Sequence, residues 1–458
     1  MKLNKIKIFA AVGIMALSAG ACKKSFFTDV NNNPNAVNFV NPNLLLPSCE
    51  IALGFTQGGD LSRYSSLFTQ QAFGEQNQTK AFYTYGINAG TFENGWSNMY
   101  TSTMENVYAL KKSCDSIGLY HAYGGVARIL LAYSLQVMVD YWGDIPYTDA
   151  LKGKENPFHL QPKYDNAAAL YDTAARLVDE AISLFATTDN DLDLPGLKHD
   201  HPDQDDVMYE GDLTKWAKFG HAVKARLYLH QSKGNPAMAQ KALDEMALSF
   251  TSSEDNARYP FDGGGTTTAP WAQFMSDRAD YIAFDDNSYL VQQLQANNDP
   301  RLAIFTDGDG GLGDYYGGDA APVEFITYDE QQFATAEAVL RNGGTVVAAQ
   351  SFYRQALQSN MEKLGVKTAD INTYLTANGT LPVNVDDAIA KIAGEAYRAL
   401  FLNPEAFNTY RRTGVPAIAP AGPGNVPRRM IYPQSEYSYN GANVPKSTLY
   451  QPAIFWDK

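Results

Sequence analysis

A run of amphipathic segments that begins at Leu44 constrains the fold more than any other feature of this sequence. Apolar residues recur there at spacings of three and four, which is the period of a helix with one buried face. Such a helix cannot bury that face alone, so neighbouring helices must pack against one another. The segments with this period are residues 43–55, 93–114, 123–142, 164–185, 212–232 and 235–249.

The last two of these segments are typical of a helical hairpin. A Gly-Asn-Pro stop separates them, and the second segment carries the small residues Ala239, Ala242 and Ala247. This combination resembles a tetratricopeptide hairpin, although no clean period of about 34 residues runs along the chain. We therefore expect stacked tetratricopeptide-like hairpins over residues 44–250.

The composition changes after these hairpins. Gly, Asp, Tyr and Pro dominate residues 258–328, which predicts loops, and helical periodicity returns over 329–410. Long loops on a rigid scaffold are where binding surfaces usually lie. The sequence predicts a mostly α fold with a single domain over residues 44–458, in which 251–458 form a loop-rich, partly helical portion.

The N-terminus is typical of an export signal. Basic residues precede a short apolar run at 8–17, which is too short to span a bilayer, and "SAGAC" leads to Cys22. This pattern resembles the lipobox of a bacterial lipoprotein and predicts a signal peptide at 1–21, acylation of Cys22, and a lipid anchor and tether at 22–43. An ordinary secretory signal cut near Ala21 is the alternative.

Charge narrows the classes of ligand. The full chain has a formal charge of -14, and removal of residues 1–21 takes away three lysines and no acids, which leaves -17. Nucleic acid and anionic lipid headgroups require basic patches, so both are disfavoured, whereas neutral ligands such as sugars stay open. Cys49 and Cys114 either form a disulfide or are buried thiols, and two cysteines do not predict a metal site.

Three aspartates in "VMVDYWGDIPYTDAL" raise the question of a glycosidase, which needs two facing carboxyl groups roughly 5 to 10 Å apart. Asp140 and Asp144 would share a helix face only if one helix carried both. Gly143 and Pro146 instead predict the end of a helix and a turn, with Asp144 bound to backbone N–H groups or to an arginine. Asp149 follows in the same turn, so we interpret the stretch as structural.

Four arginines stand in the C-terminal part of this acidic chain, at Arg411, Arg412, Arg428 and Arg429. A phosphate or carboxylate site is one interpretation, because guanidinium groups bind such anions with two hydrogen bonds. We favour pairing with interior or rim carboxylates, because a helical stack with irregular ends needs polar links there.

Two further motifs resemble metal sites only in part. In "DGDGGLGDYYGGD", Asp307 and Asp309 suit the first ligands of a calcium loop, but Gly318 replaces the glutamate of the twelfth position. His199 and His201 stand in a segment typical of a surface loop. The sequence also lacks the common motifs of nucleophilic hydrolases, nucleotide binders and zinc proteases. We therefore predict no catalytic residue, no metal and no cofactor.

Several short segments together resemble one family, the SusD/RagB-like outer-membrane lipoproteins of Bacteroidetes, and its SusD-like 2 branch in particular. They occur in one order along the chain: "DVNNNPN", "DYWGDIPYTDAL", "YEGDLTKWAKFGHAVKARLYL", "QANNDPRL", "ALFLNPEAFNTYRRTGVP" and "VPRRMIYPQSEYSYNGANV". The resemblance implies a glycan-binding lipoprotein without catalysis, exposed at the cell surface on the outer membrane. It also implies a partner, a SusC-like TonB-dependent transporter that imports the oligosaccharide.

Aromatic rings outside the helical periodicity are the candidates for sugar contacts, because a flat ring covers the apolar face of a pyranose. Amide side chains nearby could bind its hydroxyl groups. Trp96, which opens a helix, is equally typical of a core residue. The resemblance transfers no contact by motif, so the candidates rest on composition and position: Gln78, Phe82, Tyr83, Tyr85, Asn88, Asn94, Trp96, Trp271, Tyr315 and Tyr316.

Alternative functions stay open at this point. A lipid-anchored helical glycosidase with an Asp or Glu pair is the main one. The same transporter role with a peptide ligand is another, because some members of the family that the chain resembles handle peptides. A helical scaffold without a small ligand is the third.

Overall fold

The computed structural model describes residues 40–153, 160–187 and 205–457. The predicted signal peptide, Cys22, most of the tether, and His199 and His201 lie outside these ranges. Asn41–Lys458 form one compact unit, and its described part is mostly α-helical, as predicted. Two small antiparallel sheets of two strands each are also present.

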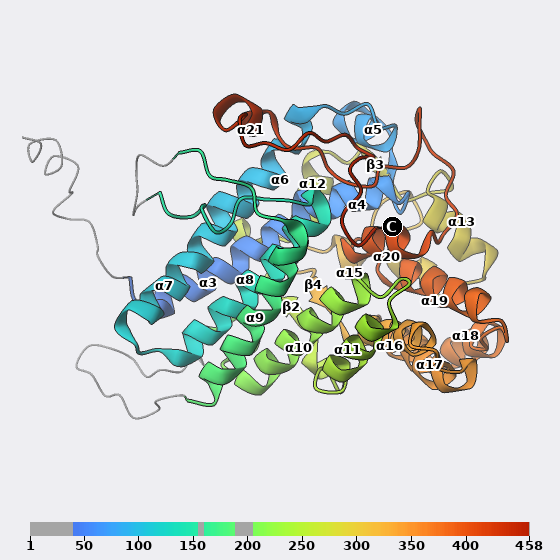
Figure 1. Ribbon diagram of the computed structural model, residues 1–458. Coiled ribbons are helices and arrows are strands. Elements are labelled where there is room, and N and C mark those ends of the chain that lie inside the picture. Colours follow the sequence, from blue (N-terminus) through green and yellow to red (C-terminus); the bar gives the residue numbers. More distant parts are fainter. Residues whose placement is uncertain (1–39, 154–159, 188–204, 458) are drawn as a thin grey trace, which may run out of the picture. The chain divides into compact units, whose positions relative to one another are not determined.

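The N-terminal half is a stack of long helices that run side by side (Figure 1). Helix α8 packs against α7 on one side and α9 on the other, and α10 packs against α9 and α11. The predicted hairpin at 212–249 is confirmed as the pair α10 and α11. The helices of this stack are α3 (Pro42–Thr56), α7 (Glu105–Ile117), α8 (His121–Trp142), α9 (Ala167–Phe185), α10 (Leu213–His230) and α11 (Pro236–Met246).

Helix α8 is the core of this stack. It is 22 residues long and, in the part of the chain that the structure describes, is the one helix apolar and long enough to cross a membrane. All of its most apolar window is buried by neighbouring helices, so we interpret it as the core helix of a globular domain. It ends at Trp142 because Gly143 follows in a backbone conformation with φ +81° that strongly favours glycine.

Polar side chains cap the starts of two further helices of the stack. Asn166 accepts hydrogen bonds from the first N–H groups of α9, and Asp212 does the same for α10. These are N-caps, which satisfy donors that have no partner inside the helix. Gly118, with φ +68°, ends α7.

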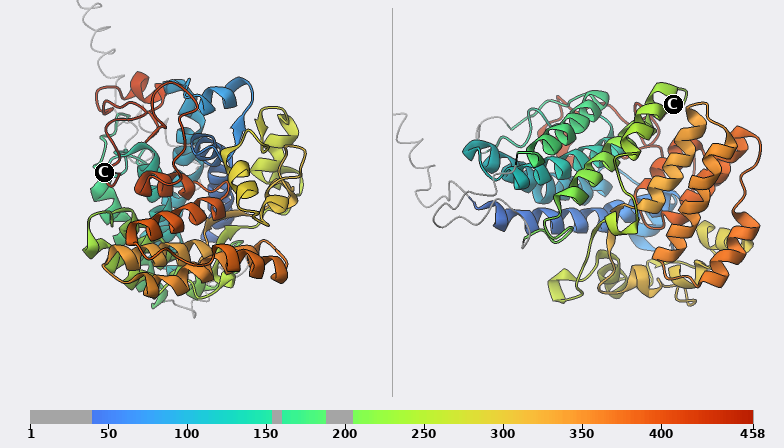
Figure 2. Two further views of the ribbon diagram at one scale, coloured as in Figure 1. Left: turned by 90° about the vertical axis from the view of Figure 1, so that its right-hand side faces the viewer. Right: turned by 90° about the horizontal axis from the view of Figure 1, so that it is seen from below.

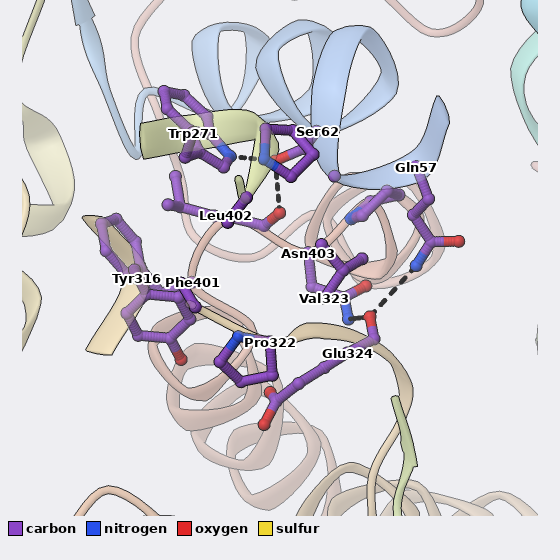
Figure 3. Close-up of a pocket in the computed structure, with 15 residues that line it drawn as sticks. Gln57, Ser62, Trp271, Tyr316, Pro322, Val323, Glu324, Phe401, Leu402 and Asn403 are labelled. Carbon is purple, nitrogen blue, oxygen red and sulfur yellow. Dashed lines mark hydrogen bonds between the residues drawn. The ribbon is translucent and has the colours of Figure 1, made fainter. Parts of the chain in front are cut away.

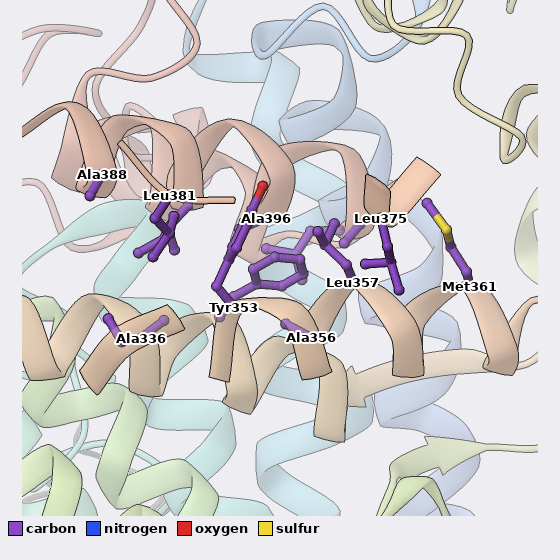
Figure 4. Packing of buried hydrophobic residues seen from close by; sticks show 14 of the residues in the cluster. Ala336, Tyr353, Ala356, Leu357, Met361, Leu375, Leu381, Ala388 and Ala396 are labelled. Atoms are coloured by element: carbon purple, nitrogen blue, oxygen red, sulfur yellow. The ribbon is translucent and has the colours of Figure 1, made fainter. Parts of the chain in front are cut away.

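A second layer of helices follows in the C-terminal half, where helical periodicity predicted it. Helices α16 and α17 pack side by side, α19 packs on both, and α16 also contacts α11 of the stack (Figure 2). Figure 4 shows Tyr353 and Leu357 of α17 between these helices, in a cluster that is buried throughout. The layer contains α16 (Tyr328–Arg341), α17 (Val346–Lys363), α18 (Thr368–Asn378), α19 (Val385–Ala399) and α20 (Glu405–Thr413).

The segment between the stack and the second layer is more regular than the predicted loops. Strands β2 (Ala257–Tyr259) and β4 (Val323–Ile326) pair in antiparallel fashion, and β3 (Ile282–Ala283) pairs with the distant β1 (Phe73–Gly74). The sequence analysis missed several short helices here, because the Pro, Ser, Asp and Gly residues at or next to their starts are also common in loops. These helices are α12 (Pro270–Asp277), α13 (Tyr289–Ala296), α14 (Leu302–Phe305), α15 (Asp314–Gly317), η4 (Ser253–Asp255) and η5 (Gly265–Thr267).

Short helical pieces also connect α3 to α7. Two of them, η1 (Gln57–Leu61) and η3 (Asn98–Met104), are π-helical, a rare form that is common at functional sites. The others are α4 (Ser62–Phe68), α5 (Asn77–Tyr83), η2 (Ala89–Phe92) and α6 (Glu93–Ser97). Near the C-terminus, α21 (Gln434–Tyr439) contacts η2.

Buried ion pairs join the stack to the second layer. Arg226 of α10 donates to Glu330 of α16 at 2.9 Å, and His230 of α10 lies 2.8 Å from Glu405 of α20. Within the second layer, Arg412 of α20 donates to Glu337 of α16 at 2.9 Å. We call this group the charge junction, and all of its members are buried: Asp140, Arg226, His230, Glu330, Glu337, Glu405 and Arg412.

Candidate ligand-binding site

A recess between η1, α12, α15, β4 and residues 401–404 contains two of the predicted aromatic residues, Trp271 and Tyr316 (Figure 3). Its volume is about 40 Å³. Most of its wall is apolar and is made by Ala269, Pro270, Trp271, Ala321, Pro322, Val323, Phe401, Leu402 and Pro404.

Most polar groups around the recess are bonded to one another. Trp271 donates from its indole nitrogen to Ser62 at 2.8 Å, and Ser62 donates to the carbonyl of Leu402 at 2.6 Å. Asn403 donates its amide to the carbonyl of Glu324 at 3.0 Å. These bonds fix the walls and leave little capacity for a ligand.

Tyr316 is the exception. Its ring is 8% exposed and packs against Phe401 at 5.0 Å between centroids, but its hydroxyl has no hydrogen-bond partner among the described residues. Burial raises the pKa of Tyr316 well above its usual value, so the group is a neutral phenol. Neighbouring Tyr315 is half-buried and donates to the Glu324 carboxylate at 3.0 Å.

An open cleft of about 400 Å³ lies on the other side of Pro270. Both π-helical segments line it, and the backbone of Gly59 departs from helical geometry there, with φ -90° and ψ -113°. A Cβ atom on Gly58 would lie 2.4 Å from a Val323 methyl group, so η1 packs closely on β4 between the cleft and the recess. The cleft is lined by Ala52, Phe55, Thr56, Gly59, Asp60, Arg63, Asn98, Ser102, Pro270, Gln273, Phe274, Asp277 and Arg278.

The polar groups of the open cleft include both hydrogen-bond donors and acceptors. Asp60 pairs with Arg63 at 2.7 Å, and the guanidinium of Arg63 lies 4.6 Å from the centre of the Phe274 ring. Arg278 lies 5.6 Å from the same ring, and Asn98 is exposed on η3. Sequence reasoning missed these residues, although the glycine pair of "QGGD" inside an apolar helical pattern was a signal.

Two aromatic residues of the predicted group at 78–94 are core residues in this structure. Phe82 packs against Tyr64 at 4.9 Å, and Tyr85 packs against Phe68 at 6.2 Å. Both are less than 9% exposed. Their rings support the surface and do not present a face to a ligand in this conformation.

Other predicted residues of this group reach the surface. Tyr83 is half-buried and packs against half-buried Phe73 at 5.0 Å. Gln78, Asn88 and Asn94 are exposed, so their amides are accessible to a ligand, apart from the Asn88 oxygen, which accepts from Gly90 N–H as part of a helix cap. None of these side chains lines the recess or the open cleft.

Trp96 belongs to an interior aromatic cluster. Its ring lies 5.3 Å from Trp142, 5.0 Å from Tyr100 and 5.9 Å from Tyr432. It is 4% exposed. Of the two interpretations given for Trp96, the structure supports the core residue.

The segment formed by η1 and α4 lies between Trp271 and the predicted group at 78–94. Ser62 faces the recess and receives the Trp271 hydrogen bond, whereas Tyr64 contacts the predicted Phe82 and also Phe92. The predicted residues therefore do not converge on one pocket. They lie on different sides of the segment formed by η1 and α4.

Comparison with known proteins places this geometry in a family. Residues 34–320 and 311–433 match the model of the SusD-like 2 family, described as starch-binding and associating with the outer membrane. The chain belongs to the SusD-like family. No curated protein matches the sequence.

Solved structures of SusD-like proteins share the fold. A SusD/RagB family protein from Bacteroides thetaiotaomicron aligns over 91% of this chain and 99% of its own, with 20% identity and a TM-score of 0.72. A Bacteroidetes SusD-like protein (AC2a) aligns over 92% and 100%, with 19% identity and a TM-score of 0.76. A protein named as chitin-binding aligns over 91% and 100%, with 21% identity and a TM-score of 0.75.

The three aspartates of the SusD-like motif "DYWGDIPYTDAL" do not face one another across an open cleft. Asp140 is buried and accepts from the Trp456 indole at 2.9 Å. Asp144 accepts from the first N–H of α9, on Ala167, at 2.8 Å, and Asp149 accepts from a backbone N–H. The interpretation of this stretch as a helix end and a structural turn is confirmed.

The four arginines of the SusD-like motifs divide into two pairs. Arg412 binds Glu337, and Arg428 binds Asp457, as the preferred interpretation predicted. Arg411 and Arg429 instead donate to backbone carbonyl groups. Backbone acceptors were not considered in the sequence prediction, because irregular chain ends give no local pattern.

Asp140, His230 and Glu405 form the one cluster of metal-ligand type found in the described part of the chain, with ligand atoms within 4.8 Å. His230 lies 2.8 Å from Glu405 through one nitrogen and 2.9 Å from the Tyr171 hydroxyl through the other. Burial alone would lower the pKa of His230, but the two carboxylates raise it overall. Both ring nitrogens of His230 already have hydrogen-bond partners, so the donor set fits a hydrogen-bonded junction better than a metal.

Two smaller predictions concern turns and thiols. The Asp307 carboxylate accepts from the N–H groups of Asp309 and Gly311 at 2.8 Å each, so it closes a turn in the predicted glycine loop. Cys49 and Cys114 are both buried, and no disulfide joins them. The thiol alternative therefore holds for these two residues.

Proposed function

We propose that this SusD-like protein is a lipid-anchored protein of the cell surface that captures oligosaccharides and passes them to a SusC-like TonB-dependent transporter. The proposal rests on the open cleft. It is supported by the family, which is described as starch-binding and as associating with the outer membrane. The resemblance of "SAGAC" to a lipobox supports the anchor at Cys22.

The chemistry of the cleft favours a neutral saccharide. Each sugar hydroxyl both donates and accepts, and the cleft supplies two carboxylates, two guanidinium groups and the amides of Asn98 and Gln273. Phe55, half-buried on α3, adds a ring that could cover an apolar sugar face. Its volume of about 400 Å³ is within the usual range of ligand pockets, roughly 300–1,000 Å³.

Binding of a glycan panel by calorimetry tests this proposal. Asn98→Ala should weaken binding about two- to tenfold, which is the effect of one lost hydrogen bond. The matched control is Asn372→Ala. Asn372 is an exposed residue of α18 that does not line the cleft, so this variant should bind as the unmodified protein does. Tyr83→Ala and Tyr315→Ala test the half-buried rings that the sequence predicted.

Other results would replace parts of the proposal. Binding of peptides and of no saccharide would change the ligand class and leave the transporter role standing. Release of reducing ends from a bound polysaccharide would establish a glycosidase instead. Failure to co-purify a barrel protein from outer membranes, with a Cys22→Ser variant as the unanchored control, would count against the transporter role.

A further inference from the structure

The recess around Trp271 opens at one place. Among the residues that line it, Pro322, Val323 and Glu324 are half-buried, and the remainder are buried. The mouth therefore lies at the start of β4, next to the half-buried ring of Tyr315.

The size of the recess limits what can enter. One water molecule needs roughly 10–15 Å³ of such space, so about 40 Å³ accommodates a group of about three heavy atoms. A pyranose ring with its hydroxyl groups is larger than this and would stay outside the mouth. Only a substituent of a sugar could reach the inner wall.

The chemistry of the wall selects the substituent. Trp271, Phe401 and Leu402 offer apolar contact, whereas the polar groups nearby are used in bonds to one another. The hydroxyl of Tyr316 is the exception, buried and without a partner among the described residues. Figure 3 shows this oxygen on the Pro322 side of the recess, which is the side of the mouth.

A small group with one methyl and one hydrogen-bond acceptor fits these conditions. We propose that the recess binds the acetyl group of an acetylated sugar, as in an N-acetylhexosamine, an inference that rests on the proposed glycan binding. The methyl group lies against Trp271 and Phe401, and the carbonyl oxygen accepts from the Tyr316 hydroxyl. The sugar ring lies outside, beside Tyr315 and the Glu324 carboxylate.

Calorimetry with matched trisaccharides tests the inference. Tri-N-acetylchitotriose and cellotriose differ at the acetamido groups, and we expect the acetylated sugar to bind more tightly. Tyr316→Phe removes only the hydroxyl and should reduce this preference about two- to tenfold, with cellotriose affinity unchanged. O-acetylated xylotriose separates an O-acetyl from an N-acetyl source of the same group.

Two further variants keep the test interpretable. Ala321→Val adds methyl groups inside the recess and should abolish the preference while the Tyr316 hydroxyl remains. Tyr353→Phe, on a buried tyrosine of α17 that bonds the Asn378 carbonyl, is the control and should leave both affinities unchanged.

The outcomes separate the two proposals. Equal binding of both trisaccharides, or a preference that survives Tyr316→Phe, would overturn the acetyl inference and leave glycan capture intact. Absence of binding to every saccharide in the panel would remove the function itself.

Discussion

The charge junction and the recess are both buried polar regions, but they differ in how far their hydrogen-bonding groups are used. In the junction, the single carboxylate of Glu405 contacts three residues, His230, Arg412 and Asn408. In the recess, the Tyr316 hydroxyl has no partner among the described residues. Buried groups that bind one another hold a fold together, whereas a buried group without a partner indicates space for something else. This difference distinguishes the recess from most of the charge junction, where one oxygen of Glu330 is the exception.

Removal of one member of the junction should have the largest effect. Arg412→Met leaves Glu337 and Glu405 buried with less compensating charge, and we expect a loss of about 3–5 kcal/mol in the free energy of unfolding. Urea denaturation measures it. The control is Arg176→Met, which breaks an ion pair whose arginine is 61% exposed and should cost less than about 1 kcal/mol. Equal costs would remove the contrast between the junction and the surface.

Glu330 is the one place where the junction is incompletely satisfied. One of its oxygens has no partner among the described residues, and burial, opposed by Arg226, raises its pKa from 4.5 to about 7. Because the pKa of Glu330 is higher in the folded state than in the unfolded state, its protonation stabilises the folded protein when the pH is below the unfolded pKa. This stabilisation is lost as the pH rises through about 7.

Glu330→Gln should therefore become more stable relative to the unmodified protein between about pH 4.5 and 7. We expect the difference in unfolding free energy between the variant and the unmodified protein to shift in favour of the variant by about 2–3 kcal/mol from pH 4.5 to pH 8. Thermal unfolding across this range measures it. A difference that does not change with pH would mean that Glu330 is ionised throughout.

Two buried tyrosines allow a direct comparison of the regions. Tyr171 donates to Asp140 and contacts His230, whereas Tyr316 donates to nothing among the described residues. Tyr171→Phe should lower the free energy of unfolding by about 1–3 kcal/mol, because its charged partners lose a hydrogen bond. Tyr316→Phe should cost less than about 0.5 kcal/mol without ligand or should stabilise the protein. A similar loss in both would show that the Tyr316 hydroxyl is bonded in solution.

Local patterns predicted the scaffold well. The hairpin predicted at 212–249 agrees with the bounds of α10 and α11 to within a few residues. It could be predicted because the helical period, the cap at Asp212 and the Gly-Asn-Pro stop are all local signals. The turn after Trp142 followed from Gly143 and Pro146 for the same reason. The SusD-like motifs added the family and the order of the parts.

The binding regions were predicted less well, because they depend on contacts between distant segments. The recess exists where Gly58 of η1 packs on Val323 of β4, and no local pattern records that pairing. Sequence reasoning selected Trp271 and Tyr316 for their rings, but it could not show that they share one recess. It missed Arg63 and Phe274, because their contact joins α4 to the distant α12 and is visible only in the folded structure.

Asp144→Asn should have a small effect, and it tests the interpretation of the three aspartates as structural. Its carboxylate accepts from Ala167 N–H at the start of α9, where the helix dipole favours negative charge. Asp144→Asn keeps an oxygen acceptor and removes the charge, so we expect a loss of about 0.3–1 kcal/mol in unfolding free energy. The loss should shrink in high salt, because Asp144 is partly exposed and salt screens the interaction of its charge with the helix dipole. Thermal unfolding at low and high salt measures it, and unchanged glycan affinity is expected alongside. A variant that instead lost sugar binding, with stability intact, would move Asp144 from the scaffold to the ligand site.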